Sequence, residues 1–145
     1  MKKSEKILAT TQYIFLTAIL LLGGYYVYCM TWNYKIVEFK SDAIMEKSVY
    51  KIGDELTYTV DYCKYLPLAG KIYPELTDGV VYGLRNSESN APVGCGKKIM
   101  SVGRTPNVHG GTYYIRMKAI YRVNPFREVT VEYHTNEFII ISDKK

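Results

Sequence analysis

Histidine and tryptophan are scarce in this chain, which holds only His109, His134 and a single tryptophan, Trp32. Zinc and copper sites and serine-type catalytic triads rely on histidine, and neither histidine stands at metal-ligand spacing from a cysteine. A Gly-x-Ser-x-Gly elbow is also missing, and no carboxylate pair lies in a pattern that indicates shared burial. The sequence therefore predicts a protein that is not an enzyme and that carries no metal site and no cofactor.

Charge is absent from one long segment, because no Asp, Glu, Lys or Arg occurs from Ile7 to Tyr34. A helix of about twenty apolar residues is about 30 Å long, which matches the hydrocarbon core of a bilayer. The apolar stretch is too long for a typical signal peptide, and no small-x-small cleavage site follows it. We therefore expect residues 11–34 to form one uncleaved transmembrane helix, a signal anchor embedded in the lipid bilayer.

Aromatic and basic residues around this segment predict its orientation. Lys2, Lys3 and Lys6 precede the helix, whereas Lys35 and Lys40 follow it, so the positive-inside rule places residues 1–10 in the cytoplasm. The expected membrane-interface aromatics cluster at the other end of the helix: Tyr25, Tyr26, Tyr28, Trp32 and Tyr34. The prediction is a single-pass protein of the cell (inner) membrane with a periplasmic or extracellular C-terminal domain.

Three cysteines are present, and only Cys63 and Cys95 lie beyond the apolar segment that contains Cys29. An even pair in a small domain outside the cytoplasm indicates a disulfide. Cys95 falls in the loop-like stretch from residue 85 to 98, so we expect the bridge to hold a loop against the rim of a sheet.

Alternating apolar and polar residues predict strands in the C-terminal part, with Leu56–Tyr62 and Thr112–Val123 as the clearest examples. The residues expected to face the core are Leu56, Tyr58, Val60, Tyr62, Tyr113, Ile115, Met117, Ala119, Tyr121 and Val123. The fifteen tyrosines suit a sheet, with rings packed and hydroxyls in water. About seven strands in residues 49–142 indicate a mainly β fold, an immunoglobulin-like antiparallel β-sandwich.

Shorter segments complete this prediction. Residues 35–48 form a juxtamembrane strand or linker, and Thr77–Gly79 is a tight-turn signal between Lys71–Leu76 and Val80–Leu84. Pro74 predicts that the first of these two strands is an edge strand or a bulged one, because proline has no backbone N–H to donate to a neighbouring strand.

Several short motifs carry a family resemblance: Tyr50-x-x-Gly53-Asp54, Asp61-Tyr62-Cys63-Lys64, Asp78-Gly79, Gly94-Cys95 and Asn124-Pro125-x-Arg127. The chain resembles a group of small, uncharacterised membrane-anchored immunoglobulin-like proteins of bacteriophage and environmental bacterial sequences. The resemblance implies the fold and the anchor, and it implies no activity. If the chain is phage-encoded, modification of the host envelope is the role that this resemblance favours.

Two surfaces are candidates for binding. The outward face of the long strand combines basic and aromatic side chains, and the alternative is that these pair with acidic neighbours such as Glu132 and Glu137. That face consists of Tyr114, Arg116, Lys118, Ile120 and Arg122, of which Tyr114, Arg116, Lys118 and Arg122 are the candidate binding residues. The second candidate is the loop from Arg85 to Met100, with Arg85, Asn90, Lys97 and Lys98.

The charge balance bears on the kind of partner. From Ile36 onward fifteen Lys and Arg face thirteen Asp and Glu, which is too even for a nucleic-acid binder. The prediction is a membrane-anchored extracytoplasmic module that binds an envelope protein of unknown identity by protein–protein contact. A metal- or redox-handling accessory protein based on Cys63, Cys95 and His109, and a structural subunit of a membrane complex, stay open as alternatives.

Overall fold

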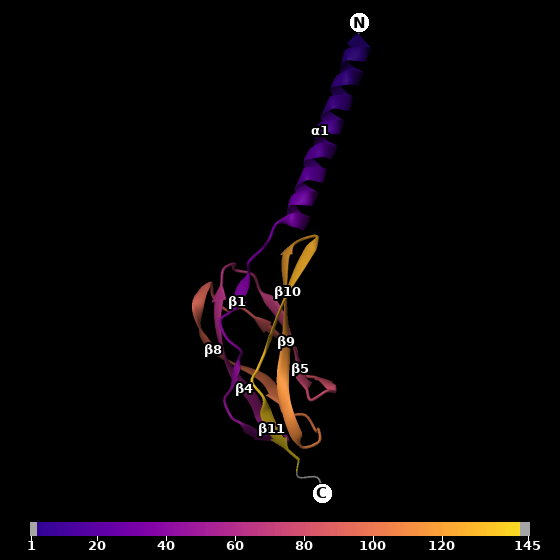
Figure 1. The fold of residues 1–145 in the computed structure, drawn as a ribbon. Coiled ribbons are helices and arrows are strands. Elements are labelled where there is room, and N and C mark those ends of the chain that lie inside the picture. The colour runs from indigo at the N-terminus through magenta and orange to yellow at the C-terminus, as the bar shows by residue number, and fades with distance from the viewer. Residues whose placement is uncertain (1–2, 143–145) are drawn as a thin grey trace. The chain divides into compact units, whose positions relative to one another are not determined.

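The structure is a computed structural model that describes residues 3–142, with one helix and eleven strands in that range (Figure 1). The chain divides into two compact units. The first contains the helix and the turn Asn124–Arg127; the second, which we call the β-domain, spans residues 34–123 and 128–142. Lys2 and the expected solvated end at Asp143–Lys145 lie outside the described residues, as does the side chain of Lys3.

The helix α1 runs from Lys3 to Thr31 and includes the 26-residue apolar stretch Lys6–Thr31, which is long and apolar enough to cross a membrane. Its side chains are exposed almost throughout, with large apolar groups such as Leu20 and Leu21 at 67% and 70%.

The β-domain is mainly β and consists of two sheets around one core, which confirms the predicted β-sandwich class. The strands are β1 (Val37–Phe39), β2 (Ile44–Met45), β3 (Val49–Lys51), β4 (Glu55–Lys64), β5 (Gly70–Thr77), β6 (Val81–Gly83), β7 (Ser87–Ser89), β8 (Gly94–Arg104), β9 (Gly111–Asn124), β10 (Arg127–His134) and β11 (Phe138–Ile141). One sheet has the order β1-β4-β2 with β8 also on β4. The other has the order β3-β11-β9-β5-β6, with β10 on β9 and β7 on β5.

The structure has more strands than the seven expected because several short pieces pair along the long ones. β1 and β2 both pair with β4, so part of the 35–48 segment belongs to the first sheet. β6 and β7 divide one side of β5 between them. Strands of two or three residues carry too little alternation to be recognised from sequence.

The predicted core registers of the two long strands are confirmed. Leu56, Tyr58, Tyr113, Ile115 and Met117 are fully buried. The rest of the predicted set is buried as well, except for Val123, which is half-buried.

The predicted hairpin is confirmed, with Thr77 paired to Val81 and Gly79 at a φ of 107° in the turn. The edge position inferred from Pro74 is wrong, because β5 lies between β9 and the pair β6 and β7. The Pro74 carbonyl accepts from Leu84 N at 3.0 Å, so its ring nitrogen faces the same side, where the pairing passes from β6 to β7. The missing N–H therefore leaves the ladder to β9 intact.

Several tyrosines are buried rather than wet, which corrects the expectation for their hydroxyls. The Tyr58 and Tyr133 hydroxyls lie 3.0 Å apart, and the Tyr113 hydroxyl donates to the His109 carbonyl at 2.9 Å. Burial raises the pKa of Tyr58 to about 12, and burial near the Asp78 carboxylate raises that of Tyr113 to about 12. These hydroxyls act as structural hydrogen-bonding groups inside the sandwich.

Candidate functional site

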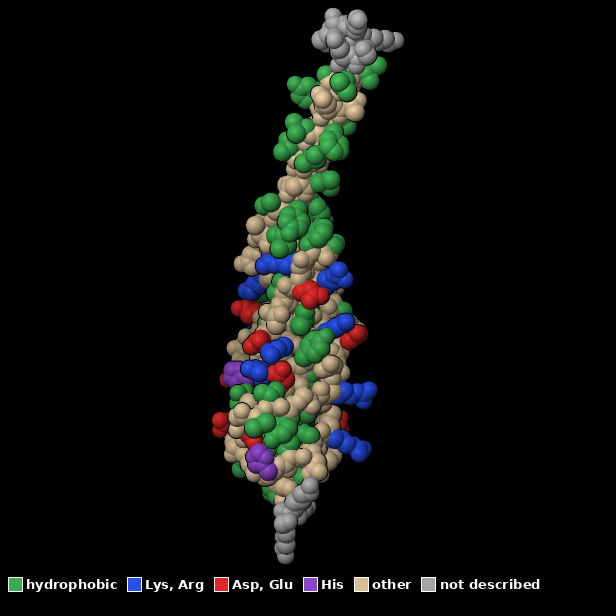
Figure 2. Space-filling view, turned by 90° about the vertical axis from the view of Figure 1, so that its right-hand side faces the viewer, with side chains coloured by type: hydrophobic (Ala, Val, Ile, Leu, Met, Phe, Trp, Pro, Cys, Tyr) green, Lys and Arg blue, Asp and Glu red, His purple; other side chains and the backbone are tan. Residues whose placement is uncertain are grey.

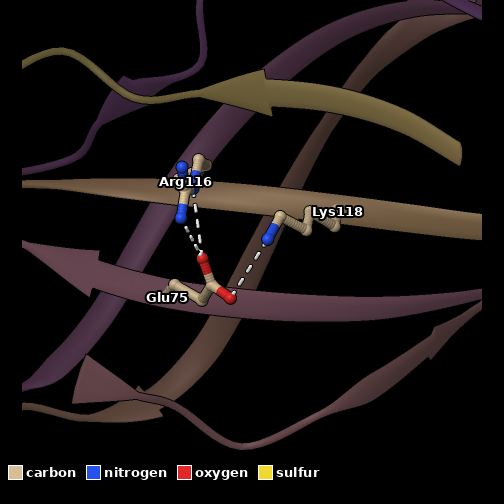
Figure 3. A network of polar contacts seen from close by, with 3 residues as sticks. All are labelled: Glu75, Arg116 and Lys118. Atoms are coloured by element: carbon tan, nitrogen blue, oxygen red, sulfur yellow. Dashed lines mark hydrogen bonds and ion pairs between the residues drawn. The ribbon is translucent and has the colours of Figure 1, made fainter. Parts of the chain in front are cut away.

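The outer face of β9 carries an ionic network rather than free cations. Glu75 on β5 lies opposite Arg116 in the ladder and accepts from Arg116 Nη2 at 2.7 Å and Nε at 3.1 Å (Figure 3). The other carboxylate oxygen of Glu75 lies 3.4 Å from Lys118 Nζ. The hydrogen bonds from Arg116 hold the pKa of Glu75 below its usual value. Two candidate binding residues are therefore already paired within the sheet.

Arg116 and Lys118 pair with an acidic neighbour, as the alternative interpretation expects, but that neighbour is Glu75 rather than Glu132 or Glu137. Cross-strand register decides the pairing, because directly opposed side chains on one face lie closest. The hydrogen bond and the charge of Glu75 raise the pKa of Arg116, and the nearby charge of Glu132 adds a smaller effect in the same direction.

Beside this network lies an open cleft of about 530 Å³, which we call the β9–β10 cleft. It is lined by Asp42, Tyr114, Arg116, Glu132, Tyr133, His134, Thr135, Asn136 and Glu137. Tyr114 and Arg116 come from the predicted binding face, and Lys118 and Arg122 do not line the cleft. The remaining lining residues were not predicted as site residues, although Glu132 and Glu137 were named as acidic neighbours; they come from the chain before β2, from β10 and from the segment that joins β10 to β11.

The floor of the β9–β10 cleft is held by hydrogen bonds between distant parts of the chain. Thr135 is buried, and its backbone N–H donates to the Ile115 carbonyl at 2.9 Å, while its hydroxyl accepts from Ile115 N at 3.0 Å. The Asn136 side-chain oxygen accepts from Met45 N at 2.7 Å, and Asn136 N donates to the Ala43 carbonyl at 3.0 Å. The cleft therefore has a rigid base on which exposed side chains are presented.

Charge around the cleft is mixed with an acidic excess. Asp42, Glu132 and Glu137 face one guanidinium, Arg116, and His134 Nε2 lies 3.4 Å from the Asp42 carboxylate. Both members of that histidine pair are exposed, so they are open to a partner. On the face shown in Figure 2, basic and acidic side chains are interspersed over the β-domain rather than gathered by sign. Such an arrangement favours a polar contact of defined geometry over general attraction to a polyanion.

The second candidate surface differs from the expected loop. Lys97 and Lys98 lie on β8, which pairs with β4 from Gly94 to Arg104, whereas Arg85 and Asn90 lie in exposed irregular chain. Every residue from Gly94 to Ile99 is exposed, so this part of β8 has no buried face that alternation could reveal.

The predicted bridge between Cys63 and Cys95 is present. The two residues are directly paired between β4 and β8, so the disulfide joins neighbouring strands instead of pinning a loop to the rim. Both sulfurs are thereby unavailable as metal ligands. In the described range 3–142, no group of three or more His, Cys, Asp and Glu residues is placed to hold a metal ion. His109 pairs with the Asp78 carboxylate at 2.8 Å.

Four of the five interface aromatics lie at the C-terminal end of the helix region and are exposed, at 50% or more: Tyr25, Tyr26, Tyr28 and Trp32. Tyr34 is half-buried and packs against the core of the β-domain.

Compared with known proteins, the chain matches no protein-family model and no curated protein at a significant level.

Proposed function

We propose that the protein is a membrane-anchored binding module whose β-domain docks an envelope protein outside the cytoplasm. The exposed apolar helix supports the anchor, and the disulfide supports an oxidising compartment for the β-domain. The N-terminal lysines favour a cytoplasmic N-terminus in the cell membrane. The immunoglobulin-like relation and a role in modifying the envelope of a phage-infected host are parts of the same proposal and rest on the short turn motifs.

The β9–β10 cleft is the observation that carries the binding role. It combines an aromatic ring, Tyr114, with a rim of exposed charges over a base fixed by backbone hydrogen bonds. Aromatic and arginine side chains are enriched at the centres of protein interfaces, and rigid presentation lowers the entropy lost on binding. Arg116 is oriented by Glu75, so one edge of its guanidinium is held in place beside the cleft.

Site-specific photocross-linking in intact cells tests this proposal. A photoreactive amino acid replaces Tyr114 or Glu137 in the cleft, and matched control variants carry it at Val80 or Val49, which are exposed and lie outside both candidate binding surfaces. Cross-linked products are identified by mass spectrometry. We expect one recurrent envelope protein from the two cleft positions and not from the controls.

Two results would contradict the proposal. The first is equal capture from all four positions, which indicates random collision. The second is no protein cross-link from the cleft in a protein that is abundant and correctly folded.

A further inference from the structure

The turn Asn124–Arg127 between β9 and β10 belongs to the same compact unit as the helix. This turn contains the motif Asn124-Pro125-x-Arg127, and the docking role proposed above does not use it. Asn124 and Arg127 donate hydrogen bonds to carbonyl groups at the C-terminal end of the helix region.

The end of an α-helix leaves its last carbonyls without intrahelical donors, and α1 has no basic residue in its last turn. Here the Val27 carbonyl accepts from the Thr31 hydroxyl at 2.8 Å and the Tyr28 carbonyl from Trp32 N at 3.0 Å. The Cys29 carbonyl, one residue further, accepts from the Asn124 side-chain amide at 2.9 Å.

Arg127 completes the set, since its Nη1 donates to the Met30 carbonyl at 2.8 Å and to the Trp32 carbonyl at 2.7 Å. A guanidinium at this end also meets the negative pole of the helix dipole. The amide of Asn124 is oriented by its own turn, because its oxygen accepts from Phe126 N at 2.9 Å. Two side chains distant in sequence thus satisfy carbonyls that the helix itself leaves open.

Phe126 at the tip of this turn is 53% exposed although it is fully apolar. Its ring contacts Tyr26 edge-on, with the ring centres 5.5 Å apart, and Tyr28 and Trp32 form a second ring pair at 5.1 Å. These rings lie at the end of a helix that is long enough to cross a bilayer. Aromatic side chains favour the interfacial layer of a bilayer. Backbone carbonyls without a hydrogen-bond donor are costly near lipid, because no water is there to replace the donor.

We propose that Asn124–Arg127 is the C-terminal cap of the membrane helix and that Phe126 inserts into the interfacial layer of the lipid bilayer. The inference rests on the proposed membrane anchor and adds a second lipid contact, far along the sequence from the helix. The occupant is the bilayer itself, because the exposed ring continues the row of aromatics at the helix end.

Depth-dependent quenching tests the lipid contact in the full-length protein reconstituted into phosphatidylcholine nanodiscs. Trp32 is the only tryptophan, so the background variant W32F allows one reporter at a time. The reporter variant is W32F/F126W, and the matched control is W32F/V80W, because Val80 is 57% exposed in another turn. Lipids brominated at shallow or deep positions of the acyl chain supply the quencher.

We expect shallow bromines to quench the W32F/F126W variant strongly and the W32F/V80W variant little. A third variant, W32F/L20W, reports the helix itself and should be quenched most by deep bromines. Quenching of W32F/L20W without quenching of W32F/F126W overturns this inference and leaves the anchor standing. Absence of quenching in both overturns the anchor as well.

Hydrogen–deuterium exchange tests the cap separately. The R127A variant removes the donor to two carbonyls, and R85A serves as the control for loss of an exposed arginine. We expect peptides covering residues 25–33 to exchange about tenfold faster in R127A, since hydrogen bonds to charged groups are the stronger ones. Unchanged exchange in a folded R127A protein would show that the turn does not cap the helix.

Discussion

Reduction of the Cys63–Cys95 disulfide should lower the stability of the β-domain substantially. The two cysteines are 32 residues apart and directly paired between β4 and β8. Because the two strands are already hydrogen-bonded to each other, the bridge acts mainly by restricting the unfolded chain. For a loop of this length the chain-entropy model gives roughly 3–4 kcal/mol.

The assay is thermal unfolding of the full-length protein in detergent, followed by far-ultraviolet circular dichroism of the sheet with and without a phosphine reductant. For a domain of about 100 residues, each kcal/mol corresponds to about 4 °C at the low end of the usual range, so Tm should fall by about 12–16 °C. The C63A/C95A variant should melt near the reduced protein and be insensitive to reductant. Cys29 is the free cysteine, and a C29A variant should respond like the wild type.

A fall of less than about 3 °C, with mass spectrometry confirming complete reduction, would refute this reasoning. It would mean that the reduced, unfolded chain already keeps β4 and β8 together.

Three further substitutions test the packing and the ionic network by chemical denaturation. The G70A variant should lose about 1–3 kcal/mol of unfolding free energy, because an added Cβ would lie 2.5 Å from the buried ring of Tyr121. The control G83A should lose clearly less, because an added Cβ there would meet no atom within 4 Å. Equal losses would contradict the close approach at Gly70. The I115A variant removes a side chain that is fully buried and should lose about 2–5 kcal/mol of unfolding free energy, whereas a loss under 1 kcal/mol would contradict its place in the core. The E75Q variant should lose a little unfolding free energy at neutral pH. The pKa of Glu75 is lowered below 4.5 in the folded state, so the stability difference between wild type and E75Q should hold above pH 4.5 and vanish as the pH falls further below it. A difference that does not change with pH would contradict the ion pairs.

Long alternating strands were predictable from sequence because one face is buried and the other is not. The inward residues of β4 and β9, such as Tyr58 and Met117, were assigned correctly for that reason. β8 was missed because six successive residues from Gly94 are exposed, so no alternation marks it. The edge position inferred from Pro74 was wrong, because a proline can lie within an inner strand when its ring nitrogen points away from the hydrogen-bonded neighbour, here β9.

The candidate site was predictable only in part. Tyr114 and Arg116 were identified from strand alternation, but their companions Asp42 and Glu137 reach the cleft only through the fold. The bridge Ala43–Thr135, which brings these segments together, joins residues far apart in the chain and leaves no local signal. The pairing of Arg116 with Glu75 likewise depends on the register of β5 against β9, which composition cannot supply.

Labelling with a membrane-impermeant maleimide tests whether the helix crosses the membrane and whether the β-domain lies outside the cytoplasm. Variants T130C and S4C are prepared in a C29A background, in which Cys63 and Cys95 stay joined in the disulfide and do not react with maleimide, and are labelled in intact spheroplasts and after lysis. Thr130 is exposed on β10 and Ser4 precedes the apolar stretch. We expect labelling of T130C in intact spheroplasts and of S4C only after lysis. Labelling of S4C in intact spheroplasts, or protection of T130C until lysis, would contradict it.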